Sequence, residues 1–246
     1  MNRKKLLAGL LLVIVAIPCM AQGDDFGIWT SADFKKKLFT GFNVTVGGEF
    51  RTRDDSKKVE RWSGTLGVDY TLLKWMKWDA GYTYLYNNVA GRTTSKGNYV
   101  SPYWISRDRF YTSLEGEVNL GRFVVSLRER YQYTYRHSKA VAKYNDDGER
   151  KSADEQITGK GKNVLRTRPM IEYDIRKSAF KPYLSWEFYN SLNDKGAIDK
   201  YRLKVGTALK LTKRQAFDFY YLFQNHSDDD EPQGHVLGLG YTYKFK

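Results

Sequence analysis

Residues 42–53 read FNVTVGGEFRTR, and this stretch decides the fold because its residues alternate in character. One side of the alternation is mainly apolar and consists of Phe42, Val44, Val46, Gly48, Phe50 and Thr52. The other side is polar and consists of Asn43, Thr45, Gly47, Glu49, Arg51 and Arg53. A period of two is typical of a β-strand that has one apolar and one polar face.

The same period recurs along nearly the whole chain. It predicts ten strands of about 10 to 14 residues, at residues 42–52, 62–72, 78–86, 109–120, 122–136, 163–175, 180–190, 199–211, 215–225 and 235–245. Short connections near 73–77, 121–122, 176–179 and 212–215 alternate with mostly longer, polar ones at 54–58, 87–105, 137–162, 191–198 and 226–234. Short turns at one end and long loops at the other are typical of an antiparallel, up-and-down transmembrane β-barrel.

The strand count depends on the N-terminal part of the chain. Residues 26–34 also alternate, so 22–38 is either an N-terminal extension of a ten-stranded barrel or an extra strand. Counting this segment gives eleven strands and places the two termini at opposite ends of the barrel. Alternatively, a strand hidden in 87–105 brings the count to twelve. We expect ten strands, with twelve as the alternative.

Residues 1–21 have the features of a cleaved export signal, which leaves 22–246 as the barrel. Three basic residues precede an apolar run from Leu6 to Ile17, and a small residue, Ala21, stands at the expected cleavage site. As a helix this run spans about 18 Å, whereas the core of a bilayer is about 30 Å thick. The alternative is a lipoprotein acylated at Cys19, which Pro18 disfavours.

Composition excludes several classes of protein. The 246 residues contain one Cys, so a disulfide framework or a Cys-based zinc site is excluded. The formal charge of +13 would favour nucleic acid in a cytosolic protein, but export makes anionic lipid headgroups the better partner. Aromatic residues make up 15% of the chain, which excludes a disordered polyelectrolyte.

Several features favour a membrane barrel over a soluble barrel that binds an apolar ligand inside. The strands are long enough to cross a bilayer at a tilt, and Tyr and Trp lie near the ends of their apolar faces, as in interfacial girdles. The last strand places Leu237, Leu239, Tyr241, Tyr243 and Phe245 on one face. A C-terminal aromatic residue of this kind resembles the signal that the outer-membrane assembly machinery reads.

The polar faces predict a lumen lined by arginines and carboxylates. We assign to this charge network Glu49, Arg51, Arg53, Arg109, Glu115, Arg128, Arg130, Arg166, Arg168, Glu187 and Arg202. Simple hairpin registers place Glu115 opposite Arg128, Arg168 opposite Glu187, Asp174 opposite Lys181 and Lys210 opposite Asp218. Glu129 breaks the pattern, because it lies on an apolar face.

Two polar loops contain the other candidate residues. The segment 137–162 has few apolar anchors, so we expect it to be mobile. His226 and His235 flank Asp228–Glu231, a combination that would suit a hydrolase at the barrel rim or a divalent-ion site, although an exposed acidic loop explains it as well. We assign no catalytic residue, metal ligand or cofactor.

Several motifs resemble a known family. They include Gly48–Arg53, Trp62–Tyr86, Ser126–Tyr133, Leu165–Arg168 and Tyr183–Leu192. Together they are similar to an outer-membrane β-barrel family of Gram-negative bacteria, domain of unknown function 2490. The resemblance covers nearly all of residues 22–246. It implies a barrel in the outer membrane, in contact with lipid and lipopolysaccharide, and implies no catalytic residue.

The sequence therefore predicts an all-β outer-membrane barrel that is not an enzyme. Its role is either structural, with a filled lumen, or that of a narrow, anion-preferring passage. The alternatives are a barrel-rim hydrolase of lipid or lipopolysaccharide that uses His226 or His235, and a soluble periplasmic barrel.

Overall fold

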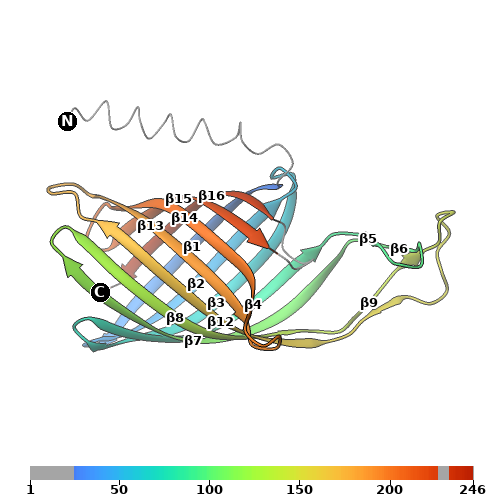
Figure 1. The fold of residues 1–246 in the computed structure, drawn as a ribbon, viewed down its shortest axis with the longest axis horizontal. Helices are drawn as coiled ribbons and strands as arrows, with labels where there is room; N and C mark the ends of the chain where they lie inside the picture. The colour runs from blue at the N-terminus through green and yellow to red at the C-terminus, as the bar shows by residue number, and fades with distance from the viewer. Residues whose placement is uncertain (1–24, 227–232, 246) are drawn as a thin grey trace.

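The computed structural model describes residues 25–226 and 233–245, and these fold into one closed barrel (Figure 1). Eleven of the described strands form the wall, in the spatial order β1-β16-β15-β14-β13-β12-β8-β7-β4-β3-β2. Their bounds are β1 Asp25–Phe39, β2 Phe42–Arg53, β3 Lys58–Leu73, β4 Met76–Val89, β7 Tyr103–Leu120, β8 Phe123–Arg136, β12 Lys160–Tyr173, β13 Phe180–Ser191, β14 Ala197–Lys210, β15 Gln215–His226 and β16 Gly234–Phe245.

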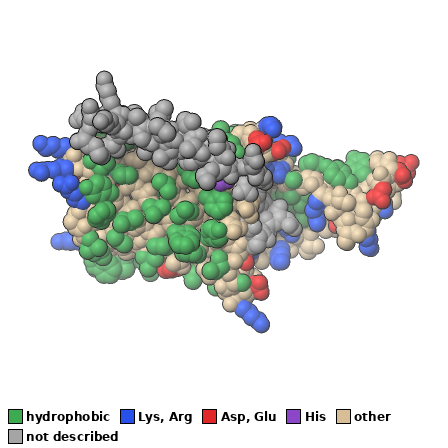
Figure 2. Space-filling view, turned by 45° about the horizontal axis from the view of Figure 1, so that its top comes forward, with side chains coloured by type: hydrophobic (Ala, Val, Ile, Leu, Met, Phe, Trp, Pro, Cys, Tyr) green, Lys and Arg blue, Asp and Glu red, His purple; other side chains and the backbone are tan. Residues whose placement is uncertain are grey.

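The alternation places apolar side chains outside and polar side chains inside the barrel. On the outer face Phe110 is 54% exposed, Leu114 47% and Val205 50%. Inside, the guanidinium-bearing side chain of Arg61 is almost completely buried. Figure 2 shows hydrophobic side chains covering the barrel wall, with Lys and Arg gathered at the ends. Within the described residues, no helix is long and apolar enough to span a membrane.

The expected strand count of ten was wrong, and so was the alternative of twelve. The segment expected to be either an N-terminal extension or an extra strand is strand β1, which pairs with β2 in antiparallel and with β16 in parallel orientation. An odd number of strands requires one parallel pair, and this pair closes the barrel. Segment 87–105 contains only the short strands β5 (Arg92–Thr93) and β6 (Tyr99–Val100) between β4 and β7, and neither belongs to the wall.

The two ends of the barrel differ. The turn end carries the short connections 40–41, 74–75, 121–122, 174–179 and 211–214, together with the end of β16. The loop end carries the longer connections and the start of β1, since Asp25 is registered with Gly234 and Lys36 with Phe245. The two termini of the described barrel therefore lie at opposite ends.

Two loops combine into an arm that projects from the loop end (Figure 1). Strands β5, β6 and β10 (Lys143–Tyr144) form one sheet, and β9 (Lys139–Val141) pairs with β11 (Glu155–Ile157). A small apolar core joins them, made of Val89, Val100, Tyr103, Ile105, Val141 and Ile157. The structure therefore differs from the expected mobile loop, because two segments distant in sequence supply the apolar anchors that neither has alone.

Most of the expected registers are present. Glu115 is registered with Arg128, as predicted. The pairs Thr167↔Phe188 and Met170↔Ser185 give β12 and β13 the predicted register, and Lys181 bonds Asp174 at 3.1 Å.

One register was wrong. Lys210 is registered with Ala216, and Asp218 with Ala208. The turn between β14 and β15 is tighter than the expected five-residue loop, because the hydroxyl of Thr212 accepts the backbone N–H groups of Arg214 and Gln215. The resulting shift of two residues leaves each side chain on its predicted face.

The predicted signal, residues 1–21, and Cys19 within it lie outside the described residues.

The position of β1 yields a testable topology. Single cysteines replacing Asp25, Asp55 and Lys213, in a Cys19→Ser background, mark the start of β1, a loop and a turn. We expect a membrane-impermeant maleimide to label Asp25→Cys from the same side as Asp55→Cys and from the side opposite to Lys213→Cys. Labelling of Asp25→Cys together with Lys213→Cys would mean that β1 does not close the barrel as described.

Candidate functional site

A cavity of about 630 Å³ occupies the loop end of the lumen, and we call it the vestibule. Among the residues that the structure describes, its charged lining is mostly cationic, with Arg or Lys at ten positions and Asp at two. These residues are Arg51, Arg61, Arg107, Arg109, Arg136, Lys160, Lys162, Arg166, Lys200, Arg202, Asp194 and Asp199. Low-dielectric walls that carry mainly one sign of charge concentrate the electric field inside a cavity.

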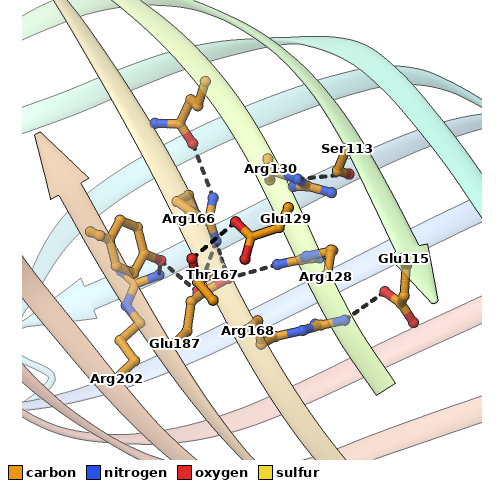
Figure 3. A network of polar contacts seen from close by, with 12 residues as sticks. Ser113, Glu115, Arg128, Glu129, Arg130, Arg166, Thr167, Arg168, Glu187 and Arg202 are labelled. Carbon is orange, nitrogen blue, oxygen red and sulfur yellow. Dashed lines mark hydrogen bonds and ion pairs between the residues drawn. The ribbon is translucent and has the colours of Figure 1, made fainter. Parts of the chain in front are cut away.

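The floor of the vestibule is organised around the carboxylate of Glu187 on β13, which is 10% exposed (Figure 3). Arg128 Nη2 bonds Glu187 Oε1 at 2.7 Å, and Arg166 Nη2 reaches both carboxylate oxygens at 2.9 Å. The hydroxyl of Tyr189 also donates to Glu187, at 2.8 Å. Charge-assisted bonds of this length are the strong class, and they hold two guanidinium groups in fixed orientations.

A second carboxylate, Glu49, holds the opposite side of the floor. Arg51 Nε donates to Glu49 Oε1 at 2.7 Å and Arg61 Nη2 donates to the same oxygen at 3.4 Å. Arg51 also stands over the ring of Trp29 on β1, with its Cζ 3.4 Å from the ring centroid. The guanidinium of Arg202 stands over the same ring at 4.9 Å. Trp29 thus binds β1 to the wall by cation–π contacts.

Arg202 links the two sides of the floor. Its Nη1 donates to the Tyr189 hydroxyl at 2.5 Å and its Nε to Gln224 Oε1 at 3.0 Å. Tyr189 is in turn bonded to Glu187. The guanidinium of Arg202 is therefore held by hydrogen bonds to side chains that are themselves hydrogen-bonded. The floor is therefore a preorganised set of donors.

Further charge groups lie beside the floor and between the floor and the turn end. Arg130 bonds Asp79 at 3.0 Å and Arg168 bonds Glu115 at 3.0 Å. Lys204 bonds Asp218 at 2.9 Å, and the Tyr183 hydroxyl donates to the same carboxylate at 2.7 Å.

Many of these ion pairs join strands that are not neighbours. Glu115 on β7 is registered with Arg128 on β8 but bonds Arg168 on β12. In the same way Arg128 passes over β12 to bond Glu187 on β13. The cause is curvature: inside a barrel, side chains of second-neighbour strands converge over the strand between them, and a long arginine reaches across.

The predicted network residues divide into three groups. Arg51, Arg109, Arg166 and Arg202 line the vestibule. Glu49, Glu115, Arg128, Arg130, Arg168 and Glu187 form the ion pairs of the floor and the lumen below it. Arg53 ends β2 at the loop end and is not part of the vestibule lining.

Sequence reasoning missed several residues of the site. Trp29 was not assigned to the charge network, because its segment was expected to be either an extension or an extra strand. Four basic residues near strand ends were also missed, because the alternating pattern stops there and loop sequence begins. They are Arg107, Lys160, Lys162 and Lys200.

Glu129 remains on the outer face. The registers of β8 with β7 and β12 run past it without interruption, so no bulge turns it inward. Its carboxylate accepts a hydrogen bond from the hydroxyl of Thr167 at 2.9 Å, from the neighbouring strand. Glu129 therefore interrupts the apolar outer face in the structure, as its place in the alternation indicated. A hydrogen bond from the neighbouring strand satisfies one of its carboxylate oxygens.

His137 and His235 are not among the residues that line the vestibule. His137 Nε2 lies 2.6 Å from Asp108 Oδ2, and Tyr82 donates to the other oxygen of this carboxylate, Oδ1, at 2.5 Å. His235 Nδ1 contacts the Tyr221 hydroxyl at 2.5 Å. His226 ends β15, and Asp228–Glu231 lie outside the described residues. Cooperation of these two histidines with the acidic loop therefore stays a prediction.

The floor makes a prediction about stability. Replacing Glu187 with Gln leaves Arg128 and Arg166 without their shared countercharge. We therefore expect the free energy of unfolding to fall by about 3 kcal/mol. The measurement is urea unfolding of the detergent-solubilised barrel. The matched control is Glu117→Gln, whose more exposed pair with Lys77 spans 3.5 Å and should contribute less than about 1 kcal/mol. Equal losses in the two variants would contradict a special role for Glu187.

This chain resembles known proteins in its fold and in its sequence family. Over 85% of this chain and 86% of the other, the fold is similar to the β domain of the Bordetella autotransporter BrkA, with a TM-score of 0.53 and 14% identity. The NanC porin gives a TM-score of 0.49 at 14% identity, over 91% of this chain and 100% of that one. No curated protein sequence matches. The family described as "Protein of unknown function (DUF2490)" matches residues 26–235, and the chain therefore belongs to that family.

Proposed function

We propose that this chain is an outer-membrane barrel that takes anions into the vestibule from the loop end and forms a narrow, anion-preferring passage. The observation that carries the proposal is the lining of the vestibule, in which the described part of the chain supplies ten cationic side chains and two aspartates. A solute that enters must replace its hydration by these groups, and only an anion can do so favourably.

The passage is narrow because the lumen below the vestibule is occupied by bonded side chains. Arg128, Arg166 and Glu187 cross it at the floor, where Arg130 also bonds Asp79, and Arg168 and Glu115 follow below. An ion that continues toward the turn end passes from one guanidinium to the next. Carboxylates placed between these arginines limit how tightly each site holds the ion, as conduction requires.

The outer surface supports a membrane location. The wall strands have 12 to 18 residues, more than the 9 to 11 or so that cross a bilayer, and their outward side chains are exposed and apolar, as at Leu66, Leu114 and Val205. Lipid and lipopolysaccharide are the partners that this surface would contact. The assembly machinery would read β16, which ends in outward, half-exposed Phe245.

Neither alternative function gains a specific observation. A soluble barrel would keep its apolar ligand inside, but this lumen is lined by ion pairs. The hydrolase would need His226 or His235 beside a nucleophile, and Asp228–Glu231 lie outside the described residues.

The location is tested by fractionation and by gel mobility. We expect the protein in the outer-membrane fraction, and we expect a detergent-solubilised sample to migrate differently before and after boiling, because a closed barrel resists unfolding by detergent. Recovery in the soluble periplasm would exclude the membrane function.

The passage is tested by planar-bilayer conductance under a KCl gradient. We expect a reversal potential that reports chloride preference. The double variant Arg109→Gln/Lys200→Gln removes two lining charges and should lower the ratio of anion to cation permeability at least about twofold, since the local potential falls with each charge removed. The matched control is Lys213→Gln/Arg214→Gln, which removes two charges at the turn end.

Absence of current, cation preference, or equal shifts in the two double variants would each count against the passage.

A further inference from the structure

The turn end of the barrel carries an excess of exposed positive charge. The structure describes every residue of its five short turns, and six of them are exposed cations that we call the basic collar: Lys74, Arg122, Arg176, Lys177, Lys213 and Arg214. The same turns contain one carboxylate, Asp174, which bonds Lys181 at 3.1 Å. Figure 2 shows Lys and Arg side chains gathered at the end of the barrel that lies away from the arm.

Within the described part of the chain, no carboxylate bonds a side chain of the basic collar. Arg122 Nη1 donates to the neutral hydroxyl of Tyr173 at 3.4 Å, which leaves its charge in place. The carboxylates at the neighbouring strand ends have other partners: Glu117 bonds Lys77 at 3.5 Å and Glu172 bonds Lys181 at 3.2 Å. The charge of the collar is therefore available to an anion outside the chain.

The basic collar extends around most of the barrel. Its residues lie in the turns β3–β4, β7–β8, β12–β13 and β14–β15, and these strand pairs follow one another along the wall. The turn β1–β2 has no charged residue, but Lys37 is exposed just before it. A soluble partner would cover one side of such a ring, whereas a membrane leaflet meets it on all sides.

Large apolar side chains are interleaved with these cations. Trp75, next to Lys74, is 54% exposed. Exposed apolar residues also stand beside the other turns, at Leu73, Leu120, Phe123, Phe180 and Leu211. Aromatic side chains favour the boundary between hydrocarbon and headgroups, and the apolar stems of Lys and Arg lie there with the charged group in water. The collar therefore has the composition of a surface placed at lipid headgroups.

We propose that the basic collar binds the headgroups of anionic phospholipids in the leaflet that borders the turn end. This inference rests on the proposed membrane location, and it adds the class of lipid and the residues that select it. In bacterial outer-membrane barrels the short turns face the periplasm, so the collar meets phospholipid and not lipopolysaccharide. Lys and Arg close to an anionic membrane surface are attracted to it, and this attraction falls off within a Debye length.

The collar is densest where two neighbouring turns each carry two cations. Arg176 and Lys177 lie between β12 and β13, and Lys213 and Arg214 lie between β14 and β15. These turns are neighbours because β13 pairs with both β12 and β14. A guanidinium group can bind a phosphate through two parallel N–H bonds, so the two arginines suit phosphodiester headgroups. We expect this part of the collar to make the largest contribution to headgroup selection.

The test measures how spin-labelled lipids associate with the full protein reconstituted in phosphatidylcholine vesicles. Electron spin resonance separates lipids that contact the protein from lipids that do not. We expect spin-labelled phosphatidylglycerol to associate at least about twofold more strongly than spin-labelled phosphatidylcholine at low salt, because of its negative charge. High salt should weaken this preference, since exposed charges are screened.

The decisive variant is Arg176→Gln/Lys177→Gln/Lys213→Gln/Arg214→Gln. It removes four charges of the collar and no residue of the vestibule lining. We expect it to lose at least about half of the preference for phosphatidylglycerol.

The matched control carries four Lys→Gln changes at exposed positions of the loop end and the arm: Lys57, Lys58, Lys151 and Lys195. Lys57 and Lys58 already pair with Asp55 and Asp54, at 3.4 and 2.8 Å. We expect this variant to keep the preference of the native protein. Gel mobility before and after boiling shows whether each variant is folded. Equal association of the two lipids with the native protein, or equal losses in the two variants, would overturn the lipid site.

The outcomes separate this inference from the proposed passage. Chloride preference in bilayers without a preference for phosphatidylglycerol overturns the lipid site and leaves the passage standing. A collar-dependent preference for phosphatidylglycerol without any current supports the lipid site and overturns the passage. A protein that does not enter vesicles overturns both.

Discussion

The structure depends on the compensation of arginine charges inside a closed wall. A guanidinium group cannot lose its proton, so each arginine in the lumen requires an anionic or strongly polar partner. Glu187 meets this requirement for Arg128 and Arg166 together, and Glu49 does so for Arg51 and Arg61. A few carboxylates, each shared between arginines, therefore keep the lumen polar and the strands joined across the barrel.

The strand that closes the wall also completes the site. Strand β1 fills the gap between β2 and β16 and carries Trp29 inward. The ring of Trp29 lies between the guanidinium groups of Arg51 and Arg202, which come from β2 and β14. A barrel of ten strands would have neither this ring nor the parallel seam, and its floor would be open on that side.

The described charges are distributed unevenly along the barrel axis. In the centre, carboxylates lie between arginines and bond them. At the loop end, Arg107, Arg136 and Lys160 stand side by side, and among the described residues the vestibule lining has ten cationic side chains and two aspartates.

The sequence by itself determined the all-β barrel, the inward and outward faces and most hairpin registers, because a period of two and short turns are local properties. It also identified the arginines and carboxylates of the lumen. Only the tertiary structure decided which of them bond, since curvature brings Arg168 to Glu115 across β8, and a pairing between distant strands leaves no local pattern. It likewise decided the eleventh strand, because the partner of β1 is the far end of the chain. The vestibule depends on both, since its lining residues come from several strands that meet only in the closed barrel.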